Sequence, residues 1–164
     1  MGLIRNRRVA EDTWRLLQPG DAIPADADVI VPLSVWREQR AAINARRGLT
    51  GVWLGPADDP AEVGPEPALI AVHFPVFTDG RGYSTARLLR QRYGFKGELR
   101  AIGDILRDQL YELARCGFDS FSLREDQDPI AALRAFDDFS EVYQAAADRS
   151  ALFERRFRAE EDAA

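Results

Sequence analysis

One short run of the sequence concentrates residue types that could bind a ligand. Residues 78–84 read TDGRGYS and join an apolar run to a helical pattern. Glycine lets the backbone approach a ligand closely, and the free amides at a helix start favour an anion, whose charge Arg81 or Arg87 could match. A tight turn in which Asp79 or Ser84 caps the helix explains the same residues equally well. The candidate residues here are Thr78, Asp79, Gly80, Arg81, Gly82, Tyr83, Ser84 and Arg87.

Further candidates follow two later apolar runs. Asp104 and Asp108 are four residues apart with Arg107 between them, and Arg124 ends the next run. The two carboxylates could bind a cation or act in acid–base chemistry. The interpretation that the spacing favours is structural: Asp104 caps a helix and Asp108 pairs with an arginine.

Known catalytic and cofactor motifs fit this sequence poorly. The Gly-x-Gly at residues 80–82 matches part of a dinucleotide fingerprint, but Thr85 stands where a third glycine is expected. His73, the only histidine, lies in an apolar strand pattern that favours packing, and Cys116 is expected to be an inert buried thiol. No histidine pair or cysteine cluster suggests a metal. The sequence identifies no cofactor and leaves open whether the protein is an enzyme.

Alternating elements position these residues. Five β-rich runs are each followed by helical periodicity: residues 28–33, 49–55, 68–75, 97–104 and 118–125. This alternation predicts a single α/β domain with a mostly parallel sheet of about five strands flanked by helices, doubly wound like a Rossmann or flavodoxin fold. An incomplete (β/α) barrel is the alternative. In open α/β sheets ligands bind at the carboxyl ends of the strands where the strand order reverses, so the candidate residues are expected to converge there.

Residues typical of helix ends predict where the helices begin and end. Ser34 and Gly48 are expected to begin and end the first helix, and Asp59 and Asp128, each followed by proline, to cap later ones. Residues 1–27 are expected to form an extended lead-in or a hairpin around Trp14, Leu16 and Leu17, and residues 28–147 the α/β domain. Residues 148–164 are expected to form a charged helix and tail, in which Leu152, Phe153 and Phe157 are a candidate contact stripe.

Composition narrows the class of protein. The formal net charge is −5, which argues against a general nucleic-acid binder. No apolar run is long enough to span a bilayer, the first residues lack a signal-peptide centre, and a single cysteine fits a reducing compartment. A cytoplasmic protein is expected. Lys96 is the only lysine among 22 basic residues.

The motifs FTDGRGYS, GELRAIGD and RDQLYELARCGFD, together with GVWLGPADDP and ALRAFDDFSEVYQ, resemble a bacterial family, domain of unknown function 934. The family is associated with assimilatory sulfite reduction. The resemblance therefore implies an accessory protein or subunit of that system, with sulfite reductase or another sulfate-assimilation protein as partner and a small oxyanion as ligand. The alternative is a small oxidoreductase that uses a nicotinamide or flavin nucleotide, its phosphates held at residues 80–84. Self-association stays open.

Overall fold

Most neighbouring strands of the sheet are also consecutive in the sequence. The computed structural model describes residues 2–137. Within them, eight strands form one sheet in the order β2-β1-β8-β7-β6-β5-β4-β3. The strands are β1 (Leu3–Arg5), β2 (Arg8–Ala10), β3 (Arg15–Leu16), β4 (Val29–Pro32), β5 (Thr50–Leu54), β6 (Leu69–Phe74), β7 (Glu98–Gly103) and β8 (Ser120–Ser122).

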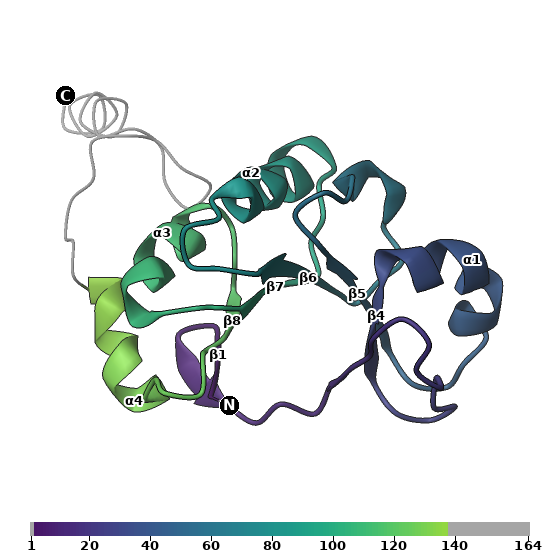
Figure 1. Cartoon of the computed structure of the whole chain (residues 1–164), viewed down its shortest axis with the longest axis horizontal. Helices are drawn as coiled ribbons and strands as arrows, with labels where there is room; N and C mark the ends of the chain where they lie inside the picture. The colour runs from purple at the N-terminus through teal and green to yellow at the C-terminus, as the bar shows by residue number, and fades with distance from the viewer. Residues whose placement is uncertain (1, 138–164) are drawn as a thin grey trace, which may run out of the picture.

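Helices follow β4 to β8 and lie on the outer side of the curled sheet (Figure 1). They are α1 (Leu33–Asn44), η1 (Pro60–Glu62), α2 (Arg81–Arg87) continued by the π-helix η2 (Leu88–Arg92), η3 (Arg107–Gln109) with α3 (Leu110–Arg115), and α4 (Pro129–Ala132) with η4 (Leu133–Asp137). The result is a half-barrel.

The predicted doubly wound fold is therefore wrong. From β3 to β8 each parallel strand is added to the same side of the one before it, so the strand order never reverses. Right-handed crossovers that always advance in one direction place every helix on the same face and let the sheet curl. All five predicted strands are present, and the sheet holds three more. The alternative of an incomplete barrel is compatible with this arrangement.

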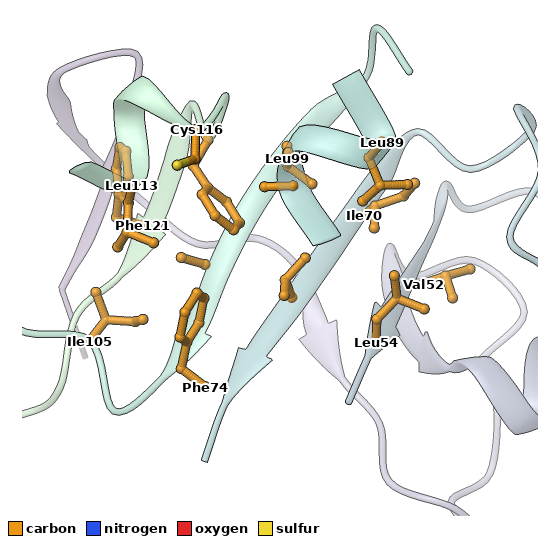
Figure 2. Packing of buried hydrophobic residues seen from close by; sticks show 14 of the residues in the cluster. Val52, Leu54, Ile70, Phe74, Leu89, Leu99, Ile105, Leu113, Cys116 and Phe121 are labelled. Atoms are coloured by element: carbon orange, nitrogen blue, oxygen red, sulfur yellow. The ribbon is translucent and has the colours of Figure 1, made fainter. Parts of the chain in front are cut away.

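The main core fills the space between the outer face and the helices. Alternate strand residues such as Ile70, Phe74, Leu99 and Phe121 point into it, and Figure 2 shows Ile70 near Leu89 and Phe121 near Leu113 of α3. The inner face has a smaller cluster of Ile30, Leu69, Ala71 and Ile102, against which Trp14 and Trp53 pack. Because β6 is covered on both faces, its sequence is apolar almost throughout.

The inner face also carries a buried arginine. Arg100 of β7 is 1% exposed, and its guanidinium donates to Glu98 (2.7 and 3.0 Å) and to Asp12 (2.9 Å). Asp12 belongs to the segment 11–14, which crosses the inner face from the first hairpin to β3 (Figure 1). The ion pair fastens this segment to the middle of the sheet.

Residues 2–27 supply both ends of the sheet. The hairpin of β1 and β2 turns at Asn6 and Arg7, whose φ values are 51° and 59°, and β1 pairs antiparallel with β8. Trp14 and Leu17 flank β3, which pairs in parallel with β4 at the opposite end. Residues 138–164, including the predicted tail and its stripe, lie outside the described residues.

The predicted helix signals have mixed outcomes. Asp59 and Asp128 cap their helices as expected, accepting from the amides two residues on (both 2.9 Å). Ser34 does not cap α1: the helix begins one residue earlier, directly after Pro32. The helix ends at Asn44, and Gly48 is small for another reason, since a Cβ there would lie 2.2 Å from the carbonyl oxygen of Ala27.

Candidate functional site

The carboxyl ends of β6, β7 and β8 form the edge at which the candidate residues meet. Phe74 and Gly103 are register partners, and Gly103 has a φ of 101° that only glycine adopts readily. This conformation lets the Asp104 amide donate to the Phe74 carbonyl oxygen (2.8 Å). The Asp104 carboxylate then accepts from the Phe77 amide (2.9 Å) through one oxygen and from Arg124 (2.8 Å) through the other. Asp104 is thus not the helix cap that its spacing favours.

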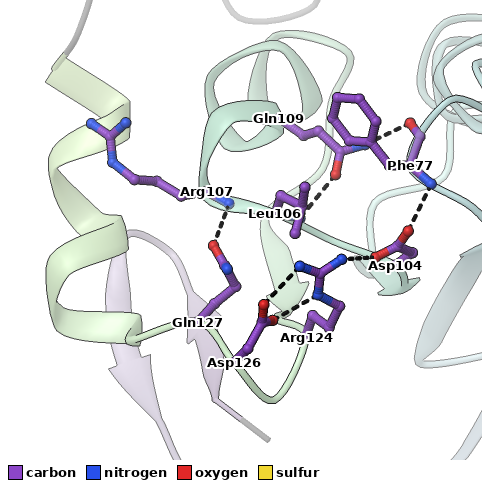
Figure 3. Close-up of polar contacts among 8 residues, drawn as sticks. All are labelled: Phe77, Asp104, Leu106, Arg107, Gln109, Arg124, Asp126 and Gln127. Atoms are coloured by element: carbon purple, nitrogen blue, oxygen red, sulfur yellow. Dashed lines mark hydrogen bonds and ion pairs between the residues drawn. The ribbon is translucent and has the colours of Figure 1, made fainter.

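Arg124, directly after β8, lies between two carboxylates (Figure 3). Its Nη1 donates to Asp104, while its Nε and Nη2 donate to the two oxygens of Asp126 (2.6 and 2.7 Å). These hydrogen bonds lower the pKa of Asp126 to about 2 and raise the pKa of Arg124. Each of the three guanidinium nitrogens therefore donates to a carboxylate.

The loop after β6 displays two large apolar side chains at this edge. Val76 is 52% exposed and Phe77 is 47% exposed. The Phe77 backbone is nevertheless held at both polar atoms: its amide donates to Asp104, and its carbonyl accepts from Gln109 Nε2 at 3.4 Å. The Asp79 amide closes a turn on the Val76 carbonyl (3.0 Å). The backbone that carries these two apolar side chains is therefore held in place.

At the start of α2, the Arg81 guanidinium forms an ion pair with the Asp79 carboxylate. Arg81 donates its backbone amide (3.1 Å), Nε (2.9 Å) and Nη2 (2.6 Å) to the Asp79 carboxylate. Asp79 therefore orients this arginine, whereas the N-cap position of α2 belongs to Gly80. These hydrogen bonds lower the pKa of Asp79 and raise the pKa of Arg81. The helix begins at Arg81, so Ser84 lies inside it and does not cap it. Thr78 is an exposed loop residue.

The structure requires glycine at only one of the two glycine positions of this run. Neither has positive φ: Gly80 is the helix cap with φ −81°, and Gly82 lies inside the helix. A Cβ on Gly80 would meet nothing within 4 Å, whereas a Cβ on Gly82 would lie 2.4 Å from the Phe74 ring. Phe74 also meets Tyr83 edge-to-face, with ring centroids 5.5 Å apart. Gly82 is required by packing against the sheet.

Three predicted residues lie apart from the Asp104–Arg124 network. The Arg107 guanidinium points toward α4, away from Arg124 (Figure 3). It donates to Asp108 (3.2 Å), so Asp108 pairs with an arginine, as the sequence predicts. Arg87 lies on the outer side of α2. With Tyr83, Ser84, Glu112 and Cys116 it lines a separate groove of about 380 Å³ between α2 and α3.

The histidine and the cysteine occupy packed positions. His73 meets Trp53 edge-to-face on the inner face (5.9 Å), and burial lowers the pKa of His73. Cys116 is buried in the outer core, which raises the pKa of its thiol. Within residues 2–137 no group of three acidic, histidine or cysteine side chains is placed to hold a metal ion. No helix of that part of the chain is long and apolar enough to cross a membrane.

Sequence reasoning missed the apolar part of this edge. Val76 and Phe77 fall in the loop after the predicted strand 68–75, and no sequence signal separates an exposed phenylalanine from a core one. Gln109 has a specific structural role that its sequence position does not reveal: its Oε1 accepts from the Leu106 amide (2.9 Å), and its Nε2 donates to the Phe77 carbonyl (3.4 Å).

Comparison with known proteins gives one family. No curated protein matches the chain. The model of a bacterial protein family of unknown function, DUF934, matches residues 51–153, which include β5 to β8, the Phe77 loop and the Asp104–Arg124 network. That match covers more than half of the chain, and this protein belongs to the DUF934 family.

Proposed function

We propose that this protein is an accessory protein or subunit of the assimilatory sulfite reduction system, and that it contacts a protein partner through the carboxyl edge of its half-barrel. The contact surface comprises Val76, Phe77, Asp104, Arg124 and Asp126. The sulfite-reduction context rests on the family resemblance. The choice of this edge rests on the geometry of the Phe77 loop.

The single observation that carries the proposal is an exposed phenylalanine on a fixed backbone. Burial of the exposed half of a Phe side chain contributes on the order of 1 kcal/mol, so display of Phe77 leaves that gain for a partner. Because Asp104 and Gln109 already hold the loop, little conformational entropy is lost when the partner binds. Rigid aromatic anchors beside charged groups are typical of the centres of protein interfaces.

The charges at the edge fit a protein partner better than a small oxyanion. Arg81 is bound by Asp79, and Arg124 by Asp104 and Asp126. A sulfite or sulfate ion would compete with a carboxylate for either guanidinium. A protein surface can instead extend these ion pairs at their rim without breaking them.

The first experiment tests the biological context. Deletion of the gene should leave growth on cysteine normal and impair growth on sulfate or sulfite, and the tagged protein should co-purify with sulfite reductase from cells grown on sulfate. Normal growth on sulfite, with normal reductase activity in extracts, would contradict the proposal.

The second experiment tests the surface. Phe77→Ser should weaken binding to the purified partner by about tenfold or more while the melting temperature holds, because the removed side chain is largely in solvent. Leu49→Ser is the matched control: Leu49 is 56% exposed and lies at the opposite pole, before β5. If the two variants bind equally well, the contact lies elsewhere on the molecule.

A further inference from the structure

A second recess lies at the pole opposite the proposed contact surface. Two loops that lead into the amino ends of β6 and β7, residues 60–67 and 93–97, enclose a cleft of about 390 Å³. Its volume is in the range of small-molecule sites. Pro60, Pro65, Pro67, Tyr93 and Phe95 supply most of its walls.

Both walls are held by buried or partly buried hydrogen bonds. The Trp36 indole donates to the Val63 carbonyl (2.9 Å) in the first loop. Arg90 donates through Nη1 to the carbonyls of Phe95 (2.8 Å) and Gly97 (2.9 Å) in the second, and its Nη2 binds Asp119 (2.7 Å). The cleft is therefore preformed, and a ligand would not have to order it.

The rim of the cleft carries positive charge that its own acids do not balance. Lys96, the only lysine of the chain, lines the cleft and is exposed. No salt bridge joins it to an acid among residues 2–137, and the two acids of the loop 60–67 have arginine partners: Glu62 binds Arg37 (2.9 Å) and Glu66 binds Arg40.

The wall chemistry indicates the shape of the ligand. Proline rings and the Tyr93 ring present flat apolar faces, which suit an aromatic ring better than a flexible chain. The Arg92 guanidinium lies over the Tyr93 ring, 5.8 Å from its centroid, and adds a second cation close to this wall. A flat apolar body with one anionic group satisfies both features.

We propose that this cleft binds a small aromatic carboxylate, with its ring between the proline loop and Tyr93 and its carboxylate at Lys96. The site is distinct from the carboxyl edge, and it does not depend on the function proposed for that edge.

The test uses 2-naphthoate and its neutral isostere 2-naphthamide as probes, with the full-length protein followed by amide NMR. Gly64, Gly94 and Gly97 line the cleft and report on it directly. We expect 2-naphthoate to shift these three signals with a Kd on the order of 1 mM, and 2-naphthamide to bind about two- to fivefold more weakly, the ratio that an exposed ion pair supplies.

Two variants complete the design. Lys96→Gln should abolish the difference between the probes, whereas Arg8→Gln, the same loss of charge on the exposed strand β2, should preserve it. The proposal is overturned if the three glycine signals do not move, if the amide binds as tightly as the acid, or if Arg8→Gln weakens 2-naphthoate as much as Lys96→Gln does.

Discussion

Replacement of Gly82 by alanine separates the two explanations of the TDGRGYS run. The added Cβ would lie 2.4, 2.8 and 2.9 Å from three atoms of the Phe74 ring. That ring is fully buried, between Tyr83 and Phe118, with centroids 5.5 and 6.0 Å away. It therefore cannot move aside without disturbing the outer core.

The expected magnitude follows from two opposing effects. An overpacked buried site costs about 1–3 kcal/mol. Alanine in place of glycine in a helix interior contributes up to about 1 kcal/mol, and less in the first turn, where Gly82 lies. The net prediction is a loss of about 1–2 kcal/mol in the free energy of unfolding. For a chain of this size that lowers Tm by about 2–8 °C.

Thermal unfolding followed by circular dichroism measures this change, with Gly80→Ala as the matched control. Gly80 has φ −81°, and a Cβ there would meet nothing within 4 Å. The Tm of the Gly80→Ala protein should therefore differ little from that of the wild type. A Gly82→Ala protein that melts at or above the wild-type temperature would refute the packing explanation. If that protein also failed to bind an anion that the wild type binds, close approach to a ligand would be the reason for the glycine.

Three further predictions concern charge. Asp79→Asn should release the Arg81 guanidinium and raise the affinity for sulfite or sulfate in calorimetry, and adding Arg81→Ala to that variant should remove the gain; no heat from Asp79→Asn at millimolar anion would contradict this. The pKa of Asp126 falls from 3.8 to about 2, so its ion pair with Arg124 should stabilise the fold above pH 4 and be lost as the pH falls toward 2, which a carboxyl NMR titration can follow. Burial lowers the pKa of His73 below 6.5, so the unfolded state binds more protons and stability should decline as the pH falls below that value; His73→Phe should reduce the slope of Tm against pH.

The sequence located the elements well because each carries a local signal. The strand at 68–75 is visible as a continuous apolar run, and Asp59 and Asp128 cap helices wherever those helices lie in space. The hairpin turn at Asn6 and Arg7 was missed because positive φ at an arginine has no reliable sequence mark.

Local sequence signals do not determine the strand order. A doubly wound sheet and a half-barrel have the same alternation of elements, and they differ only in the side on which each new strand is added. In this chain Trp14 and Trp53 cover the inner face that helices cover in a doubly wound fold. Their packing depends on contacts between residues far apart in the sequence.

The candidate site was only partly accessible for the same reason. The sequence indicated that Asp104 and Arg124 follow neighbouring strands, and they do bind each other. It could not show that the arginines of the edge are bound by carboxylates, or that Phe77 lies in solvent. Both properties depend on side-chain directions that Gly103 and Gln109 set.

The pairing of β1 with β8 determines the order in which the protein can complete its fold during synthesis. Leu3 lies opposite Ser122 and Ile4 opposite Phe121, so the first strand has no partner on that side until more than a hundred further residues have left the ribosome. The parallel strands β3 to β7 can pair progressively as they emerge, because each new strand joins the one made just before it. Ile4, fully buried in the finished protein, must meanwhile stay in water or in the hairpin with β2. The N-terminal hairpin can consequently join the sheet only after β8 has been made, and we expect a bulky fusion placed before it to impede a late step of folding rather than the first.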